Sequence, residues 1–188
     1  MPSPREWLDI LNRKLDERWA RWSVYDAYYE GDQTLAFMTR KFREAYGSLF
    51  QQLTDNYMPL VVDSGAERLR VQGFRFGSEQ DADDDAWQIW QANGLDAESN
   101  MVHTEAIKLG CAYWMVQPNG SLPRITAEHP SQVIVAHAPG DRRRRDAALK
   151  RWSDGEYIYA NVYLPDRVAK YRTTDRMLRD QIVERRWE

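Results

Sequence analysis

The spacing of apolar residues changes along this chain, from a helical repeat in the first part to a period of two in the second. From Trp7 to Trp22, apolar side chains recur every three or four residues and so define one face of a helix. Ser3, Pro4 and Glu6 supply the N-cap, the first helical residue and the third position of a capping box. The pattern predicts a first helix that starts at Pro4 and packs its apolar face on a partner.

Between this helix and residue 80 the periodicity is weaker. Residues 25–52 mix aromatic, apolar and basic residues without a clean period, so we expect mainly loop with a short helix there. A second helix is expected from about Tyr57 to Arg70, with Asn56 as its N-cap. Apolar and polar residues alternate briefly at 71–76, which predicts a short strand.

Two further helices are expected before the period changes. The acidic residues 81–85 fit the first turn of one helix, where negative charge complements the helix dipole, and Asn93 with Gly94 ends it. Asp96 is expected to cap the next helix, and Gly110 to stop it.

From residue 111 onward, alternating positions and turn-forming residues predict an antiparallel β-meander. The expected fold class is therefore α+β, with a mainly helical part at 1–110 followed by an antiparallel β part at 111–188. Residues 181–188 read as a strand with no turn or cap after it, so we expect the sequence to be a fragment whose β part is incomplete. The six strand candidates are 112–116, 124–127, 133–137, 147–152, 157–164 and 168–172.

Composition places the chain among folded domains without a strong bias toward nucleic acid. Hydrophobic residues make up 43% and charged residues 29%, and the net charge is -3, so no global basic field attracts DNA. The single cysteine, Cys111, cannot form an internal disulfide, and no apolar run is long enough to cross a bilayer. The start of the chain does not read as an export leader. We expect a soluble protein of a reducing compartment with no membrane partner.

No common catalytic or cofactor motif is present. The carboxylates at 81–85 could gather a divalent cation, but they lack the alternation and the distal Glu of a calcium loop. His103, His129 and His137 are too far apart in sequence for a close metal pair, and no phosphate-binding glycine loop occurs. We therefore expect no catalytic residue, no metal site and no cofactor.

Two groups of residues are candidates for interaction instead. Arg142, Arg143, Arg144 and Arg145 follow a Pro-Gly-Asp turn, so they are either a solvated hairpin tip or a contact for phosphates or an acidic neighbour. Trp7, Trp19 and Trp22 line the first helix and could serve either an inter-subunit contact or packing within the chain.

A series of short motifs carries a family resemblance through its order and separations. The motifs are Tyr28-Tyr29-Glu30-Gly31-Asp32, Asn56-Tyr57, Val61-Val62-Asp63, Arg68-Leu69 and Gly73-Phe74. Together they resemble the N-terminal part of the portal (head-to-tail connector) proteins of tailed bacteriophages, and the resemblance continues to Tyr163-Leu164-Pro165-Asp166. Members of that family are much longer than this chain, which again indicates a fragment.

The resemblance implies a structural role in virus assembly. Such proteins form a ring, usually a dodecamer of portal subunits, at one capsid vertex, and this chain would correspond to the wing-side N-terminal region. The implied partners are other portal subunits, terminase, capsid or scaffold proteins and tail adaptor proteins, with double-stranded DNA passing through the ring without sequence-specific contact. The implied location is the virion, and the host cytoplasm during assembly. The family is not enzymatic.

Two other functions remain open at this stage. One is a prophage-remnant interaction module that exposes its tryptophan helix through Trp7 or Trp19. The other is a metal-dependent nuclease or phosphoesterase that uses the acidic loop, with Asp83 or Asp85 essential, together with the scattered histidines.

Overall fold

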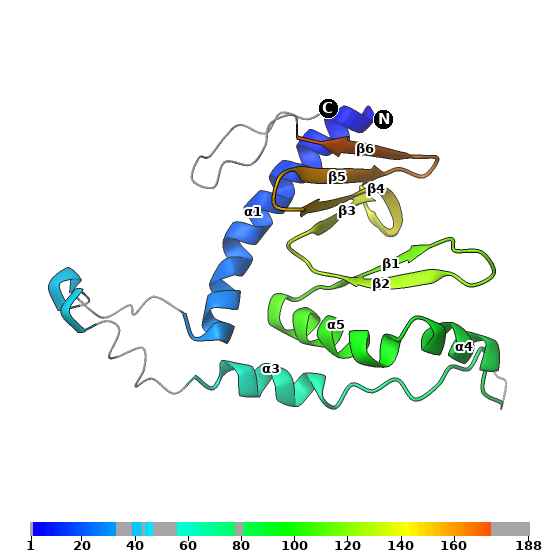
Figure 1. Ribbon diagram of the computed structural model, residues 1–188, viewed down its shortest axis with the longest axis horizontal. Helices are drawn as coiled ribbons and strands as arrows, with labels where there is room; N and C mark the ends of the chain where they lie inside the picture. Colours follow the sequence, from blue (N-terminus) through cyan, green and yellow to red (C-terminus); the bar gives the residue numbers. More distant parts are fainter. Residues whose placement is uncertain (1, 33–38, 43, 47–55, 78–80, 174–188) are drawn as a thin grey trace. The chain divides into compact units, whose positions relative to one another are not determined.

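The computed structural model describes residues 2–32, 39–42, 44–46, 56–77 and 81–173. In these residues, helices precede antiparallel strands that form two sheets, which confirms the predicted α+β class. The helices are α1 (Pro4–Glu30), α3 (Met58–Ala66), α4 (Asp84–Ala92) and α5 (Leu95–Leu109), and the strands are β1 (Tyr113–Gln117), β2 (Arg124–Glu128), β3 (Val133–Ala138), β4 (Asp141–Ser153), β5 (Ile158–Tyr163) and β6 (Val168–Arg172) (Figure 1).

The chain divides into two compact units, each of which is described by itself. Unit 1 comprises Met1–Trp19 and Pro130–Glu188, and unit 2 comprises Ala20–His129. This grouping follows contacts in space, whereas the predicted parts at 1–110 and 111–188 follow the change of periodicity along the sequence. The division at residue 110 stays a prediction.

Unit 1 is a four-stranded antiparallel sheet with the order β3-β4-β5-β6, covered on one face by the first turns of α1 (Figure 1). Ser3 and Glu6 start this helix with the predicted capping box, because Glu6 N donates to Ser3 Oγ and Ser3 N donates to Glu6 Oε2. Arg151 of β4 ties the sheet to the helix through Asn12 and through Asp16, whose Oδ1 lies 2.8 Å from its Nη2. The fully buried side chains between helix and sheet are Leu8, Leu11, Leu15, Leu149, Ala160 and Val162.

Unit 2 is built around α5. Helix α3 packs on α5 where Gly65 leaves room for Ile107, whose Cδ1 would lie 3.2 Å from a Cβ at position 65. On another side, α5 contacts strand β2 of the β1-β2 hairpin, and Glu98 Oε2 accepts a hydrogen bond of 2.8 Å from Ala127 N. Helix–helix packing and the side-chain bond from Glu98 thus both contribute to holding this unit together.

Asn93 fastens the end of α4 to the hairpin. Its Nδ2 donates to the carbonyl oxygens of Ile89 and Pro123, and its Oδ1 accepts from Ile125 N at 2.8 Å. Both N–H groups and the oxygen of the Asn93 amide are therefore engaged, so this residue connects α4 to the hairpin in addition to ending the helix.

The first helix extends beyond its predicted end. Residues 25–30 were expected to lie in loop, but α1 continues to Glu30 although Tyr25 and Tyr28 on this stretch are exposed. Tertiary contacts explain the extension, because Asp26 and Tyr29 both bond to other helices of unit 2. The remainder of the predicted loop, residues 33–38 and 47–55, lies outside the described residues.

The segment around α3 also differs from prediction. The helix is shorter than the predicted 57–70, and its N-cap is Tyr57; Asn56 Oδ1 instead accepts from Met58 N at 3.1 Å. No described residue pairs with 71–76 as a strand. Phe74 packs its ring against Trp87 and Trp90 instead, with centroids 6.3 and 5.5 Å away.

The predicted α4–α5 region is partly confirmed and partly corrected. Asp84 and Asp85 lie in the first turn of α4 and Gly110 ends α5 with a φ of 78°, as expected, and Asp83 caps α4 by accepting from Ala86 N at 2.7 Å. Asp96 was predicted as the cap of α5, which was wrong: Gly94 is the N-cap, and the Asp96 carboxylate accepts from Trp90 Nε1. These side-chain bonds lower the pKa of Asp96.

The expected single meander is divided in two. Strands β1 and β2 form their own hairpin, and β3 starts a separate sheet after Pro130. Strand β4 begins at Asp141, six residues before the predicted start at 147, so it includes the four arginines. The pairing of β3 with β4 shifts register on both sides of His137, which shows that this end of the strand is irregular. The predicted strand at 181–188 lies outside the described residues.

Candidate interaction surfaces

The motifs that carried the family resemblance meet in unit 2 and hold one another. Asn56 Nδ2 donates to the carbonyl oxygens of Tyr28 and Tyr29 at 3.1 and 2.8 Å, and Tyr29 Oη donates to Asp63 Oδ1 at 2.9 Å. Gly31 has a φ of 84°, which favours glycine, and a Cβ there would lie 3.3 Å from Asn56 Nδ2. The first three motifs are therefore one structural lock between the end of α1 and the start of α3.

A buried cation lies beside this lock. Lys108 Nζ of α5 is 2.7 Å from Asp26 Oδ1 and 2.8 Å from Glu105 Oε1, and it lies 5.0 Å from the ring centroid of Tyr29. Only 7% of the Lys108 side chain and 12% of the Glu105 side chain are exposed. Glu105 Oε2 makes no hydrogen bond with a described residue and lies 3.4 Å from His129 Nε2.

The pKa shifts show how these contacts balance. Burial by itself lowers the pKa of Lys108, but hydrogen bonds and attraction from Asp26 and Glu105 outweigh it, so that the pKa is raised. Burial, and then the hydrogen bond to Asp63, raises the pKa of Tyr29. The ammonium group thus stays charged between the two carboxylates.

The chemistry considered from the sequence does not gather at one place. Within the residues that the structure describes, no group of three or more His, Cys, Asp or Glu side chains could hold a metal ion. Asp83 is engaged as the α4 cap, while Asp84 and Asp85 are exposed in the first turn of that helix. His103 and His129 belong to unit 2 and His137 to unit 1, so neither unit contains all three histidines.

The three predicted tryptophans are all partly buried. Trp7 packs beside the core of unit 1, and Trp19 and Trp22 follow it along α1. Packing within unit 1 thus buries part of the Trp7 side chain. An inter-subunit contact by these residues stays a prediction.

The four arginines are exposed at the irregular start of β4. Arg144 Nε lies 3.4 Å from Asp146 Oδ1, and Arg143 N donates to Asp141 Oδ1 at 2.9 Å. Asp146 therefore offsets part of this positive charge. Binding by Arg142, Arg143, Arg144 and Arg145 stays a prediction.

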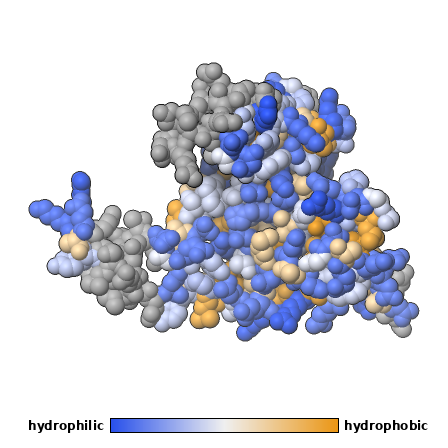
Figure 2. Space-filling model, viewed as in Figure 1, coloured by the Kyte–Doolittle hydropathy of each residue, from blue (hydrophilic) through white to orange (hydrophobic). Residues whose placement is uncertain are grey.

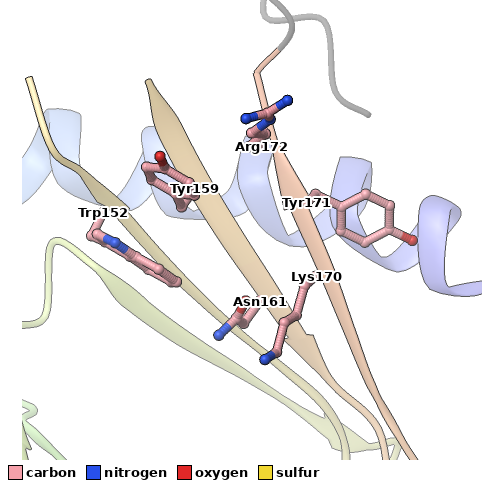
Figure 3. A pocket seen from close by; sticks show the side chains of 6 residues that line it. All are labelled: Trp152, Tyr159, Asn161, Lys170, Tyr171 and Arg172. Carbon is pink, nitrogen blue, oxygen red and sulfur yellow. The ribbon is translucent and has the colours of Figure 1, made fainter. Parts of the chain in front are cut away.

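The sheet of unit 1 carries a second surface that the sequence interpretation missed. On the side away from α1, a depression of about 440 Å³ is lined by side chains of β4, β5 and β6 (Figure 3). Tyr171 also borders it but points to the opposite side, where it packs beside the core and Arg5. We call the following set the outer sheet face: Lys150, Trp152, Tyr159, Asn161, Lys170 and Arg172.

Strand register explains why these residues meet. Lys150, Asn161 and Lys170 are successive partners across the three strands, and Trp152, Tyr159 and Arg172 form the next row. Rows two residues apart along a strand share a face, because side chains alternate with a period of two. That alternation was visible in the sequence, but the rows could be found only once the pairing of the strands was known.

The aromatic side chains of this face are fixed by their neighbours. The Trp152 and Tyr159 rings stack with centroids 5.6 Å apart and an interplanar angle of 14°. Lys150 Nζ lies 5.8 Å from the Trp152 ring centroid. Tyr159 Oη donates to Asp154 Oδ2 at 2.8 Å, and this contact raises the pKa of Tyr159. The outer sheet face thus has a stacked aromatic pair at its centre, with the side chains of three basic residues beside it.

Helix α3 exposes a cluster of apolar side chains. Tyr57, Met58, Leu60 and Val61 are between 50% and 66% exposed. Most of the face in Figure 2 is hydrophilic, with smaller hydrophobic patches between, so large apolar groups in solvent stand out from the rest of the surface.

No helix among the described residues is both long and apolar enough to cross a membrane.

Comparison with known proteins connects these features to a family. Residues 8–184 match the family model described as phage portal protein, SPP1 Gp6-like. The portal protein of Mycobacterium phage D29 is 49% identical over 123 residues, which are 58% of this chain and 25% of that protein. The portal protein of Mycobacterium phage L5 is 38% identical over 96 residues, which are 46% of this chain and 19% of that protein.

The chain therefore spans about a quarter or less of the length of these curated relatives. The family match, by contrast, takes in nearly all of the chain, including the motifs that form the lock between α1 and α3. This protein belongs to the SPP1 Gp6-like family of phage portal proteins.

Proposed function

We propose that this chain serves as the wing-side N-terminal region of a portal subunit, in a ring that occupies one capsid vertex. The single observation that supports this most strongly is the family match over residues 8–184. By family resemblance, the ring is a dodecamer through which double-stranded DNA is packaged, and it docks terminase, capsid or scaffold proteins and the tail adaptor. The location is the virion, reached from the host cytoplasm during assembly.

The geometry supports a structural and not an enzymatic role. Lys108, which could otherwise be taken for a catalytic base in a buried site, has its ammonium fully committed to two carboxylates. Asp83, the residue most needed by a metal-dependent nuclease, has one carboxylate oxygen committed to its helix. Lys108 and Asp83 thus serve packing and helix capping, which suits an assembly protein.

The domain organisation is part of the same proposal. A mainly helical part at 1–110 and a β part at 111–188 would together form the wing-side region. Trp7, Trp19, Trp22 and the arginines at 142–145 are proposed contacts to neighbouring subunits or other assembly proteins.

The test is to ask where the chain resides in particles of the phage whose genome encodes it. Purified virions are digested and analysed by mass spectrometry for peptides from residues 8–184, and antibodies against the chain are used for immunogold labelling. Peptides in particles at a low copy number relative to the major capsid protein, with gold at a single vertex, are expected. Absence from particles, with the chain present only in the soluble lysate, would instead favour a prophage-remnant interaction module.

A second experiment addresses the enzymatic alternative. The purified chain is incubated with supercoiled plasmid and with a phosphate ester, with Mg²⁺ or Mn²⁺ present. No turnover above a metal-only control is expected. Turnover that is lost in both Asp83→Asn and Asp85→Asn would contradict the structural role.

A further inference from the structure

The arginines at the start of β4 stand outside the regular pairing of the sheet. Ala138 at the end of β3 is paired with Asp141. His137, the residue before Ala138, is paired with Arg145, so residues 142–144 form a bulge between two successive pairs. Strands β3 and β5 are both fully described, and neither has a residue paired with this bulge. We use the name arginine bulge for Arg142, Arg143, Arg144 and Arg145.

The positive charge of the arginine bulge has little compensation within the chain. All four side chains are exposed, and Arg144 Nε lies 3.4 Å from Asp146 Oδ1. The other three arginines make no ion pair with a described residue. Asp141 accepts a hydrogen bond from the main chain at Arg143 N. Like charges this close together repel one another, so the bulge costs the fold some stability until an outside group supplies the opposite charge.

The unit that carries the arginine bulge is positively charged, although the whole chain is not. Unit 1 has 17 basic and 13 acidic residues, so its formal net charge is +4. Unit 2 has the remaining 9 basic and 16 acidic residues and a formal net charge of -7, which together give the -3 of the chain. The arginine bulge is the longest run of basic residues in the sequence. An anionic partner is thus attracted to unit 1, and most strongly to the bulge.

From this charge distribution, we propose that the arginine bulge binds a short acidic segment of another protein, in which several carboxylates lie close together in sequence. A guanidinium group matches a carboxylate in shape and can donate two parallel hydrogen bonds to it. Guanidinium groups on consecutive residues can therefore engage several carboxylates of one segment at once. The inference rests on the proposed assembly role, in which the chain meets other proteins, and it adds the chemistry of one such contact.

Double-stranded DNA is the other polyanion to consider, and the bulge suits it less well. A duplex carries one charge per about 1.7 Å of its axis, so its phosphates continue past the bulge in both directions. Asp141 and Asp146 border the bulge on its two sides and would repel those phosphates. A short acidic segment can instead place neutral residues beside the two aspartates.

The acids of the chain itself are also less suitable partners. The run of aspartates at 83–85 is already used by α4, because Asp83 accepts from Ala86 N at 2.7 Å. Asp84 and Asp85 lie in the first turn, where their charge complements the helix dipole. These carboxylates thus interact favourably within their own helix, and the partner is a different protein.

The experiment measures binding of labelled peptides to the purified chain by fluorescence anisotropy. The probe is the acidic peptide GSGSEDEDGSGS, and the neutral peptide GSGSQNQNGSGS is its counterpart. Wild type is expected to bind the acidic peptide more tightly, and added salt should weaken this binding because exposed charges are screened. Replacement of all four arginines of the bulge by glutamine should weaken it about tenfold or more.

A matched control removes the same amount of charge elsewhere on unit 1. It replaces four exposed basic residues by glutamine and should retain the wild-type affinity within about twofold. Replacement of the four bulge arginines by lysine keeps the charge without the planar guanidinium, and should give an intermediate affinity. The residues changed in the control are Arg13, Lys14, Arg167 and Lys170.

Thermal unfolding separates a binding role from a structural one. The glutamine variant of the bulge should melt at the same temperature as wild type or higher, because the repulsion between the arginines is removed. A lower midpoint would contradict the inference, since it would show that the arginines hold the hairpin. A folded glutamine variant also shows that lost binding does not come from unfolding.

Several binding results would overturn the inference. They are equal affinity of wild type for the two peptides, and losses in the bulge variant that are no larger than those in the control. A DNA duplex that binds the bulge more tightly than the acidic peptide would assign it to nucleic acid. Self-association in sedimentation velocity that the bulge variant loses would assign it to a second copy of the chain. None of these results affects whether the chain is found at a capsid vertex, so the proposed function is tested separately.

Discussion

Replacing Lys108 by methionine tests whether the buried ion network stabilises unit 2. Methionine retains an unbranched apolar stem of similar length, so the substitution removes the ammonium with little change in packing. The Glu105 carboxylate, 12% exposed, then loses the partner at 2.8 Å, and Asp26, 33% exposed, loses the one at 2.7 Å. The variant isolates the contribution of the charge.

The expected loss follows from the exposure of the two acids. A hydrogen bond to a charged group contributes about 1.5–3 kcal/mol, and breaking a fully buried ion pair costs about 3–5 kcal/mol. Water can replace much of the contact to Asp26 but little of that to Glu105. We therefore expect the free energy of unfolding to fall by about 3 kcal/mol, a large part of the roughly 5–15 kcal/mol typical of a domain.

The assay is urea unfolding at neutral pH, followed by circular dichroism and by tryptophan fluorescence. The matched control is Arg40→Met, which breaks an ion pair of 3.0 Å whose side chains are 93% and 65% exposed. That change should cost less than about 0.5 kcal/mol. A second substitution, Glu105→Gln in the Lys108→Met background, should recover part of the loss because it removes the unpaired charge.

A loss below about 1 kcal/mol for Lys108→Met, or a loss equal to that of Arg40→Met, would refute the reasoning. It would show that the two carboxylates find other partners or water at little cost. An increase in destabilisation on adding Glu105→Gln would also contradict it, since the remaining carboxylate would then not be the source of the penalty.

Three further outcomes are expected from the same structure. Gly31→Ala should cost about 1–2 kcal/mol, because φ is 84° and the new Cβ would lie 3.3 Å from Asn56 Nδ2; thermal unfolding checks this, and an unchanged midpoint would contradict it. Leu149→Ala should cost about 2–5 kcal/mol, because the side chain is fully buried in unit 1; a urea titration showing less than half the lower value would show that the core collapses around the site. The pKa of Lys108 and of Tyr29 is raised, so their contribution is complete below their ordinary values of 10.5 and 10.0 and is lost as pH rises through the folded values. Melting points should therefore fall above about pH 10 in wild type and fall less in Lys108→Met, and equal slopes in the two proteins would argue against this assignment.

Local rules predicted the parts of this fold that depend on neighbouring residues. The capping box of Ser3 and Glu6, the acidic first turn of α4 and the Gly110 stop each involve atoms within one turn of a helix, and each was found in place. The β-strand candidates were likewise close to the observed strands, because alternation is local information. The exception is β4, whose start in the arginine run has no apolar alternation to mark it.

Features set by distant contacts could not be predicted in the same way. The last turns of α1 are helical because Asp26 and Tyr29 bond to Lys108 and Asp63, residues far along the chain. The outer sheet face depends on the register of three strands, and the lock at Asn56 depends on where the chain returns to α1. The motifs of the family resemblance could be recognised in the sequence. That the first three of them hold α1 and α3 together could be seen only in the folded structure.

The composition of unit 1 from two distant stretches, Met1–Trp19 and Pro130–Glu188, has a consequence for synthesis. Because a chain is made from its N-terminus, the apolar face of α1 emerges from the ribosome long before β4 and β5 exist to cover it. Unit 2 is continuous and can fold while the chain is still growing, whereas unit 1 must close a loop that contains all of unit 2. Leu8, Leu11 and Leu15 thus stay uncovered from the time they leave the ribosome until β4 and β5 have been made.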